Sequence, residues 1–373
     1  MDRGREPDDA GGGRHGPDRA QGPGEQRDEA RPACLGLVRP RLPKDPCDRE
    51  RPGHRRAEPR KQLRPGRLVT RLEETTVAEP VAVVANPTSG RGKGAKLIPK
   101  VDALLRSIGV EHVMHVCADP EDPERLAREA AERGAPIVAA LGGDGQVGAC
   151  ANGVLGSDAA LAVIPAGTGN DFARYLGLNR KDPLAAARLL ASPTTRRLDV
   201  VRVRTADGER VFVNVGGTGF DSEVNGHANG VRFLKGTPKY IYSTFVTLAR
   251  FRPGKFEVDV DGEFHAIPGM MIAVGNAVSY GGGMKITPDA KADDGILDLC
   301  VIGEVSKPEF VRTFPKVFSG KHVRHPAVTV LRGKQITISA ERPFDVYGDG
   351  ERFGPLPVTF TVVPAALSVV VPS

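Results

Sequence analysis

Residues 137–145 read IVAALGGDG, and about twenty positions further on residues 161–171 read LAVIPAGTGND. Each stretch begins with a short apolar run of the length and composition expected for a buried parallel strand. Each run ends in a glycine-rich turn, and open α/β sheets bind their ligands at the carboxyl ends of the strands. The two stretches therefore predict a parallel sheet that carries a ligand site at this edge.

The composition of these turns indicates the kind of ligand. Gly142, Gly143 and Gly145 let the backbone approach a phosphate, and Asp144 offers a carboxylate that suits Mg²⁺ but repels a bare phosphate. A metal–nucleotide complex satisfies both features, so the pattern favours phosphoryl transfer. The alternative is a pair of ordinary βα turns, because Gly and Asp are common turn formers, but two such turns in register weaken it.

From residue 81 the sequence alternates between strand-like apolar runs and helical spacing. Strands are predicted at residues 81–85, 113–116, 137–141 and 161–164, and helices at residues 95–108, 123–133, 170–176 and 184–190. This β-α-β-α-β order is typical of a parallel sheet covered by helices. We expect an N-terminal Rossmann-like three-layer α/β nucleotide domain at residues 77–195.

The pattern changes after residue 196 to strand-like runs separated by Gly and Asp turns. These runs lie at residues 198–203, 211–215, 256–260, 271–274, 297–302, 328–331, 336–339 and 358–362, with helical stretches at 240–250 and 308–318. They predict a β-rich, sandwich-like second domain with antiparallel strands at residues 196–362. Tyr242 and Phe245 are interpreted as core packing, with a surface for an acyl chain as the alternative.

Residues 1–76 differ from the rest of the chain. They are rich in Arg, Pro, Gly and Asp, and the net charge of +6 is carried by residues 1–72, which hold 18 Lys and Arg against 12 Asp and Glu. With so few large apolar residues this segment is predicted to be disordered. Contact with anionic lipid headgroups is one role for it, but a solvated tail or a stretch upstream of the true start codon is favoured.

Charge, cysteine usage and hydropathy exclude several classes of protein. The body beyond residue 72 is neutral and has no nucleic-acid reader motif, which argues against nucleic acid as a partner. The five cysteines lack metal-ligand spacing and are expected to be reduced thiols. No apolar run reaches membrane-spanning length and no signal-peptide core is found, so a cytoplasmic protein without a transmembrane segment is predicted.

Several ordered motifs resemble the diacylglycerol kinase catalytic family, which comprises soluble bacterial lipid kinases related to sphingosine kinases. The resemblance covers roughly residues 80–372, and no single motif in it is specific by itself. It rests on Asn86-Pro87-x-Ser89-Gly90, Gly142-Gly143-Asp144-Gly145, Pro165-x-Gly167-Thr168-x-Asn170-Asp171-Phe172-Ala173-Arg174, Gly217-x-Gly219-Phe220-Asp221, Asn276-x-x-x-Tyr280-Gly281-Gly282-Gly283, Pro288-x-Ala290-x-x-Asp293-Asp294-Gly295-x-Leu297-Asp298 and Asp349-Gly350-Glu351.

The resemblance implies an ATP-dependent lipid kinase. Such an enzyme transfers the γ-phosphoryl group of ATP to a lipid hydroxyl with Mg²⁺ as cofactor, and diacylglycerol, giving phosphatidic acid, is the default acceptor. The resemblance also implies a cytoplasmic protein that associates peripherally with a membrane surface, and it allows a homodimer. The last strand, residues 363–373, is expected to return to the first domain.

The resemblance also implies roles for individual residues. Glu351 matches the proton acceptor of the family, and Asp144 matches a residue that binds Mg²⁺ through water. Nucleotide contacts are expected from Asn86, Gly90, Lys93, Gly142, Gly143, Asp144, Gly145, Gln146 and Thr168. A flexible loop is an equally simple interpretation of the segment around Gly90 and Lys93. For Asp171 we favour a helix cap.

A second, structural Mg²⁺ site is implied by the motif around Asp294. Its ligands would be the carboxylate of Asp294 and the backbone carbonyls of Lys291 and Ile296, since hard oxygen ligands suit this ion. The alternative is a turn that leads into a strand. Gly281, Gly282 and Gly283 are expected to line the cleft, where the backbone stays close to substrate.

The sequence departs from the family pattern directly after Gly145. The family continues with Thr, a hydrophobic residue, Asn and Glu, whereas this chain has Gln146, Val147, Gly148 and Ala149, and Cys117 stands where the family tends to have a Thr. Losing three polar contacts of about 1 kcal/mol each would weaken nucleotide binding by on the order of a hundredfold. Two alternatives therefore stay open: a nucleotide- or lipid-binding pseudokinase, and an NAD-kinase-like enzyme with a soluble acceptor.

Overall fold

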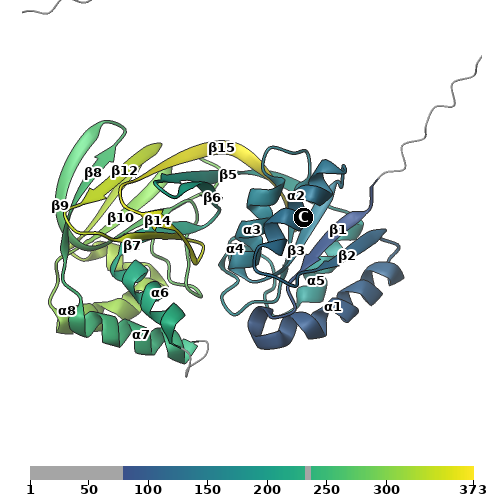
Figure 1. Cartoon of the computed structure of the whole chain (residues 1–373), viewed down its shortest axis with the longest axis horizontal. Helices are drawn as coiled ribbons and strands as arrows, with labels where there is room; N and C mark the ends of the chain where they lie inside the picture. The colour runs from purple at the N-terminus through teal and green to yellow at the C-terminus, as the bar shows by residue number, and fades with distance from the viewer. Residues whose placement is uncertain (1–78, 232–236) are drawn as a thin grey trace, which may run out of the picture. The chain divides into compact units, whose positions relative to one another are not determined.

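The computed structural model describes residues 79–231 and 237–373 of the chain. The predicted disordered tail, residues 1–76, lies outside the described residues. Figure 1 shows an α/β part that is followed along the chain by a β-rich part with helices at one end. The expected fold class, an α/β nucleotide-type domain followed by a β-rich second domain, is confirmed.

The α/β part is built on four parallel strands in the order β2-β1-β3-β4. The apolar runs that predicted these strands are buried along almost their whole length in β1, β3 and β4. The elements are β1 (Val81–Ala85), α1 (Ser89–Ser107), β2 (His112–Val116), α2 (Asp122–Glu132), β3 (Ile137–Gly142), α3 (Asp144–Val154), β4 (Ala160–Pro165), α4 (Asp171–Tyr175), α5 (Pro183–Arg188) and η1 (Leu189–Ala191).

Helices cover both faces of this sheet, which makes three layers. Because side chains alternate along a strand, Val83 and Val84 point to opposite faces. Val83 shares a core with Val101 and Leu105 of α1 and with residues of α5. Val84 shares a core with Ala127 of α2 and with residues of α3 and α4. The carboxyl ends of β1, β3 and β4 therefore meet at one edge, where the glycine-rich turns begin.

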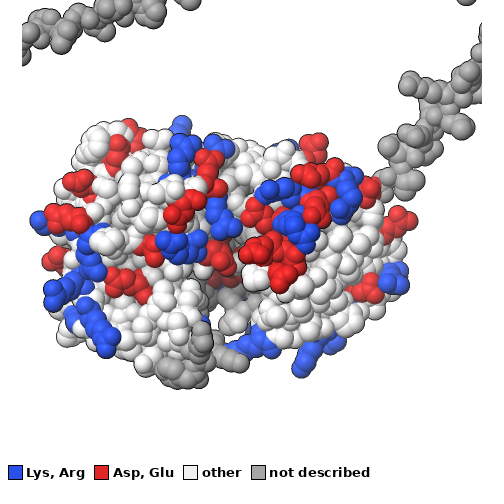
Figure 2. Space-filling view, viewed as in Figure 1, with Lys and Arg blue, Asp and Glu red and all other residues white. Residues whose placement is uncertain are grey.

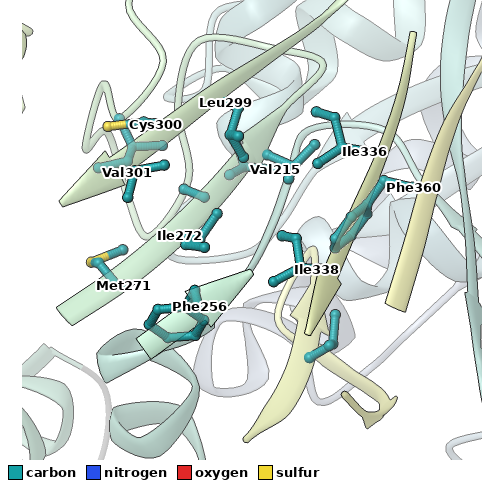
Figure 3. Packing of buried hydrophobic residues seen from close by; sticks show 14 of the residues in the cluster. Val215, Phe256, Met271, Ile272, Leu299, Cys300, Val301, Ile336, Ile338 and Phe360 are labelled. Atoms are coloured by element: carbon teal, nitrogen blue, oxygen red, sulfur yellow. The ribbon is translucent and has the colours of Figure 1, made fainter. Parts of the chain in front are cut away.

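The β-rich part packs its strands around a core of aromatic and branched aliphatic residues, some of which are drawn in Figure 3. Phe256, Ile272 and Phe360 are fully buried within it. The elements are β5 (Thr194–Thr205), β6 (Gly208–Phe212), β7 (Val215–Gly219), α6 (Phe220–Gly230), α7 (Thr237–Arg250), β8 (Gly254–Val260), β9 (Glu263–Gly275), β10 (Leu297–Gly303), α8 (Lys307–Thr313), η2 (Phe314–Ser319), η3 (Lys321–Arg324), β11 (Val328–Gly333), β12 (Gln335–Ala340), β13 (Asp345–Gly348), β14 (Glu351–Pro355) and β15 (Val358–Val371).

Strand β15 joins the two parts. The sequence predicted separate strands at residues 358–362 and 363–373, but the structure has one strand, which bends where its register on β5 shifts between Val363 and Leu367. It pairs with β12 and β5 and then runs parallel to β4, with Val369 opposite Leu161. The sheet of the α/β part thus continues into the β-rich part.

Two local predictions in the second part were wrong. Residues 211–215 were predicted as one strand, but the chain breaks at Val213 and Asn214 between β6 and β7. Their backbone N–H groups donate instead to the carboxylate of Asp349, a residue far along the chain. Helix α6 was not predicted, because its sequence contains Gly and Asn residues that disfavour helices.

Candidate active site

A cleft of about 360 Å³ opens at the carboxyl ends of the parallel strands. Both parts of the chain line it, since α3 faces β6 and the β13–β14 hairpin across it. The lining residues are Asn86, Ser89, Pro120, Pro123, Gly143, Gly145, Gln146, Gly148, Ala149, Asn152, Arg210, Val211, Gly348, Asp349, Glu351 and Phe353. The structure therefore brings Asn86, Gly143, Gly145, Gln146 and Glu351 together, as a common nucleotide site requires.

The loop after β1 takes an unusual backbone conformation beside this cleft. Asn86 organises it by accepting hydrogen bonds at Oδ1 from the backbone N–H and the hydroxyl of Thr88, at 2.9 and 2.8 Å. Gly90 has a φ of 59° and packs so closely that an added Cβ would lie 2.0 Å from the carbonyl oxygen of Ala166. Gly90 thus ties this loop to the end of β4, while the side chain of Lys93 is exposed.

Asp144 begins α3 at the edge of the sheet. Its Oδ1 accepts the backbone N–H groups of Asp171 and Phe172, at 2.6 and 3.2 Å, and so caps helix α4 from a distant part of the chain. Burial and the nearby carboxylate of Asp171 raise the pKa of Asp144 to about 6, although these hydrogen bonds oppose the shift. The other oxygen, Oδ2, remains for a ligand.

Gly169 packs closely against Oδ2 of Asp144. Gly169 has no side chain there, and an added Cβ would lie 2.8 Å from Oδ2 of Asp144 and 3.2 Å from Oδ2 of Asp171. A carboxylate oxygen is a hard ligand of the kind that Mg²⁺ prefers, so Oδ2 of Asp144 is the candidate, whereas both oxygens of Asp171 already accept hydrogen bonds, from Ser279 and Gly282. A bound cation would also relieve the repulsion between the two carboxylates that raises the pKa of Asp144.

The turn between β13 and β14 brings Glu351 to Gly145, in the first turn of α3. Asp349, at a φ of 49°, is buried and accepts backbone N–H groups from Val213 at 2.8 Å and Asn214 at 3.1 Å, which fixes the turn. Burial is the main cause that raises the pKa of Asp349 to about 7. Glu351 itself is exposed, and its Oε1 would lie 3.0 Å from a Cβ on Gly145, the residue after Asp144. An accessible carboxylate thus stands next to the first turn of the helix that Asp144 begins.

This sequence is similar to known proteins over most of its described length. Residues 80–203 match the diacylglycerol kinase catalytic domain family, and residues 214–371 match the YegS C-terminal NAD kinase beta sandwich-like domain family. The chain is 38% identical to a protein of Mycobacterium tuberculosis (strain H37Rv) named diacylglycerol kinase, over 78% of this chain and 95% of that protein. The chain belongs to the diacylglycerol kinase family.

Two further comparisons agree with this family. A Bacillus subtilis (strain 168) protein named diacylglycerol kinase is 29% identical over 78% of this chain and 95% of its own length. The crystal structure of a diacylglycerol kinase from Bacillus anthracis str. Sterne has a TM-score of 0.62 at 22% identity, and the match covers 79% of this chain and 97% of that one. At that identity the structural match shows the fold alone.

Gln146 lines the cleft, but its side-chain amide is bonded inside the protein. Its side chain is buried, and its Nε2 donates to the backbone carbonyl of Val84 at 3.0 Å and lies 3.7 Å from the thiol of Cys117. Its Oε1 has no hydrogen-bond partner among the described residues. Gly148 and Ala149 do line the cleft, so the departures from the family pattern fall on its wall.

Asp171 is not a helix cap, as we had expected, because Asp144 caps α4 in its place. The carboxylate of Asp171 instead accepts the backbone N–H of Gly282 at 2.6 Å and the hydroxyl of Ser279 at 3.1 Å, and it pairs with Arg174. Asp171 therefore holds the loop with Gly281, Gly282 and Gly283 against the α/β part. The sequence motif did not indicate this role, because the partners are more than 100 residues away.

The remaining predicted residues lie outside the lining of the cleft. Thr168 is exposed in the turn after β4, and Gly142 packs against the side chain of Gln146, with an added Cβ only 2.4 Å from its Cβ. Asp294 accepts the backbone N–H of Ile296 at 3.2 Å and pairs with Arg332 at 2.8 Å. Both oxygens of Asp294 thus have donors in the structure, and the metal role expected of Lys291, Asp294 and Ile296 stays a prediction.

Three residues of interest were missed by sequence reasoning. Arg210 and Phe353 line the cleft, with the guanidinium of Arg210 5.8 Å from the ring centre of Phe353. Asp221, at the start of α6, has a buried Oδ1 that has no hydrogen-bond partner among the described residues. Burial raises the pKa of Asp221 to about 7. In the sequence, only the motif Gly217-x-Gly219-Phe220-Asp221 indicated Asp221 as a residue of interest.

Proposed function

We propose that this protein is a lipid kinase that transfers the γ-phosphoryl group of ATP to the hydroxyl of diacylglycerol and so forms phosphatidic acid. The observation that carries the proposal is the position of Glu351, whose exposed carboxylate stands beside Gly145 and lines the cleft with it. The relatives named diacylglycerol kinase support this choice of acceptor. The reaction would take place in the cytoplasm, at a membrane surface.

In this proposal Glu351 accepts the proton of the lipid hydroxyl. The hydroxyl oxygen then bonds to the γ-phosphorus, the bond between that phosphorus and the bridging oxygen breaks, and ADP leaves. A base for this step has to reach an incoming hydroxyl, and the exposed end of β14 gives Glu351 that access.

Asp144 would hold Mg²⁺ with the Oδ2 that α4 leaves unused. When bound, Mg²⁺ neutralises charge on the transferring phosphoryl group. The glycine-rich turns at Gly143 and Gly145, with Asn86 and the loop around Gly90, would position the nucleotide. The side chains of Lys93 and Thr168 are exposed, and the two residues lie close in sequence to Gly90 and to the turn after β4. They would contact the phosphates of the nucleotide.

Phosphate transfer from labelled ATP to a panel of micellar lipids tests the proposal. The wild-type chain should phosphorylate diacylglycerol, and Asp144→Ala should abolish that transfer. Glu263→Gln, a change of an exposed residue on the β8–β9 hairpin, should leave it intact. Transfer to a soluble acceptor such as NAD⁺ instead of a lipid would contradict the proposed acceptor.

One observation favours a second candidate, a nucleotide-binding pseudokinase. The amide of Gln146 is bound to Val84 inside the protein, and Gly148 and Ala149 offer no polar side chains to the cleft. Calorimetry with Mg·ATP separates the two candidates. Binding without transfer to any lipid would favour the pseudokinase.

A further inference from the structure

The lining of the cleft contains a group of residues that the proposed function has not used. The glycine-rich turns and the loop after β1 are assigned to the phosphates of the nucleotide. The rest of the lining comes from the segment before α2 and from α2, α3, β6 and β14, and most of it is apolar. We call this group the second wall, and its apolar members are Pro120, Pro123, Gly148, Ala149, Val211 and Phe353.

The amide of Asn152, which also belongs to the second wall, is bonded within the protein. Its Nδ2 donates to the carbonyl of Gly148 at 2.9 Å and to that of Val211 at 2.8 Å, and its Oδ1 accepts the N–H of Val211 at 2.9 Å. Asn152 thus joins α3 to β6. Both of its N–H donors are used, so it has none to offer to a ligand.

Two further polar side chains next to this wall are used in the same way. The Nε2 of Gln146 donates to the carbonyl of Val84, and its Oε1 is buried. The carboxylate of Asp349 accepts the N–H groups of Val213 and Asn214. These groups hold the protein together and leave little with which the wall could recognise a ligand.

The backbone of the second wall also has few free donors. Pro120 and Pro123 carry no N–H group. Gly148 and Ala149 lie in the middle of α3, where backbone N–H groups are bonded within the helix. The wall therefore offers a smooth apolar surface in place of a pattern of donors and acceptors.

One side of this surface is planar and aromatic. The guanidinium of Arg210 lies 5.8 Å from the ring centre of Phe353, and it pairs with Glu124 at 3.5 Å, which in turn pairs with Arg128. Figure 2 shows acidic and basic side chains intermixed over α2, beside the hollow in the middle of the molecule. The ion pairs keep Arg210 at the ring, so two planar groups line the cleft side by side.

We propose that the second wall binds the base of the nucleotide by stacking and apolar contact and does not read its hydrogen-bonding edge, so that GTP, CTP and UTP serve as phosphoryl donors besides ATP. Every base has a face that stacks on an aromatic ring, and an apolar site discriminates weakly between ligands of similar shape. Strong discrimination needs polar groups that one ligand satisfies and another leaves unpaired. The inference rests on the proposed function, because it concerns the donor in that same site.

Calorimetry of the full chain, without lipid, tests the inference. The titrants are the Mg²⁺ complexes of ATP, GTP, CTP and UTP and of inorganic tripolyphosphate. The four nucleotides should have Kd values within about tenfold of one another. Tripolyphosphate has no base to stack and should bind at least tenfold more weakly than ATP.

Phe353→Leu tests the aromatic ring. Leucine keeps an apolar side chain against Phe212, whose ring centre lies 6.4 Å from that of Phe353. The variant should bind all four nucleotides at least fivefold more weakly and tripolyphosphate less than twofold more weakly. Phe245→Leu on α7 is the matched control and should change no Kd by more than twofold. Tyr242 and Phe245 were predicted to pack in the core, but the structure contradicts this, because they are 39% and 56% exposed.

Arg210→Lys tests the wall without touching the core. Lysine keeps the positive charge but is not planar, so binding of the four nucleotides should weaken at least threefold while that of tripolyphosphate stays within twofold. Gly148→Asn with Ala149→Glu adds polar side chains to the wall. It should move the ratio of the Kd values for GTP and ATP at least fivefold in favour of ATP.

A spread of more than tenfold among the four nucleotides would overturn the inference, because the wall would then read the base. Tripolyphosphate that binds within tenfold of ATP would overturn it as well, since the base would not contact the wall. The transfer assay on micellar diacylglycerol separates the two proposals. Transfer from ATP alone would support the proposed function and overturn this inference. Similar binding of all four nucleotides without transfer to any lipid would support this inference and contradict the proposed function.

Discussion

The carboxylate of Asp171 accepts the backbone N–H of Gly282 at 2.6 Å, across 111 positions of the sequence. Through this bond the turn after β4 holds the glycine-rich loop of the β-rich part in place. The same carboxylate binds the hydroxyl of Ser279 and pairs with Arg174, whose Nη2 also donates to the carbonyl of Gly282 at 3.2 Å. Asp171 is therefore a structural link between the two parts that line the site.

Asp171→Ala should lower the free energy of unfolding by about 3 kcal/mol. The change removes a buried acceptor and leaves Arg174 and the N–H of Gly282 without it. Urea denaturation measures the effect. Asp345→Ala, which breaks an exposed pair with Arg352, is the control and should cost less than about 1 kcal/mol. Equal losses in the two variants would contradict the role of Asp171.

Gly145→Ala should lower kcat at least tenfold while the fold is kept. The added Cβ would lie 3.0 Å from Oε1 of Glu351 and would displace the carboxylate from its place beside residue 145. Alanine is favoured over glycine within a helix by up to about 1 kcal/mol, so stability should not fall. Gly226→Ala in α6 is the control, since its Cβ would meet only the hydroxyl of Tyr347 at 3.8 Å. A Gly145→Ala variant with wild-type kcat would show that Glu351 does not need this position.

The stability of the protein without metal should fall as pH rises from about 4 to 7. Asp144, Asp221 and Asp349 have pKa values of about 6, 7 and 7, above the ordinary value of an aspartate. The folded protein therefore holds protons in this range that the unfolded chain has released, and deprotonation destabilises the fold. Thermal unfolding at several pH values measures the slope.

Mg²⁺ should raise the melting temperature more at pH 8 than at pH 5, because at pH 5 protons compete for Asp144. Asp144→Asn should remove most of this difference. A shift that is the same at both pH values in the wild type would argue that Mg²⁺ binds elsewhere.

The sequence predicted those elements whose cause is local. The apolar runs at residues 81–85 and 137–141 became β1 and β3, because a buried parallel strand needs only a short continuous apolar segment. The glycine-rich turns were placed at the correct edge of the sheet for the same reason. Of the residues predicted for the nucleotide, Asn86, Gly143, Gly145 and Gln146 line the cleft.

The sequence did not predict features whose cause lies far along the chain. Residues 213–214 leave the β structure because Asp349 accepts their N–H groups. Helix α6 forms despite its glycines because Phe220, Val224 and Ala228 are buried in the protein. A single sequence carries no sign of such contacts, and for the same reason the roles of Asp171 and Gln146 had to come from the structure.

Gly148→Asn with Ala149→Glu should tighten Mg·ATP binding about tenfold or more. These changes restore the polar side chains of the family pattern on the wall of the cleft, at about 1 kcal/mol for each hydrogen bond. The structure leaves room at Gly148, where an added Cβ would meet its nearest atoms, in Asp349, at 3.6 Å. Calorimetry gives the affinity, and an unchanged Kd would show that the nucleotide does not reach this wall.

Steady-state kinetics of Glu351→Gln on micellar diacylglycerol test the central claim most directly, with Mg·ATP affinity measured on the same sample. Because glutamine keeps the shape of the side chain but cannot accept the proton, kcat should fall at least a thousandfold while Kd for Mg·ATP stays within about threefold. Glu263→Gln should match the wild type in both quantities. A Glu351→Gln variant that turns over at the wild-type rate would contradict the account, because another group would then have to accept the proton.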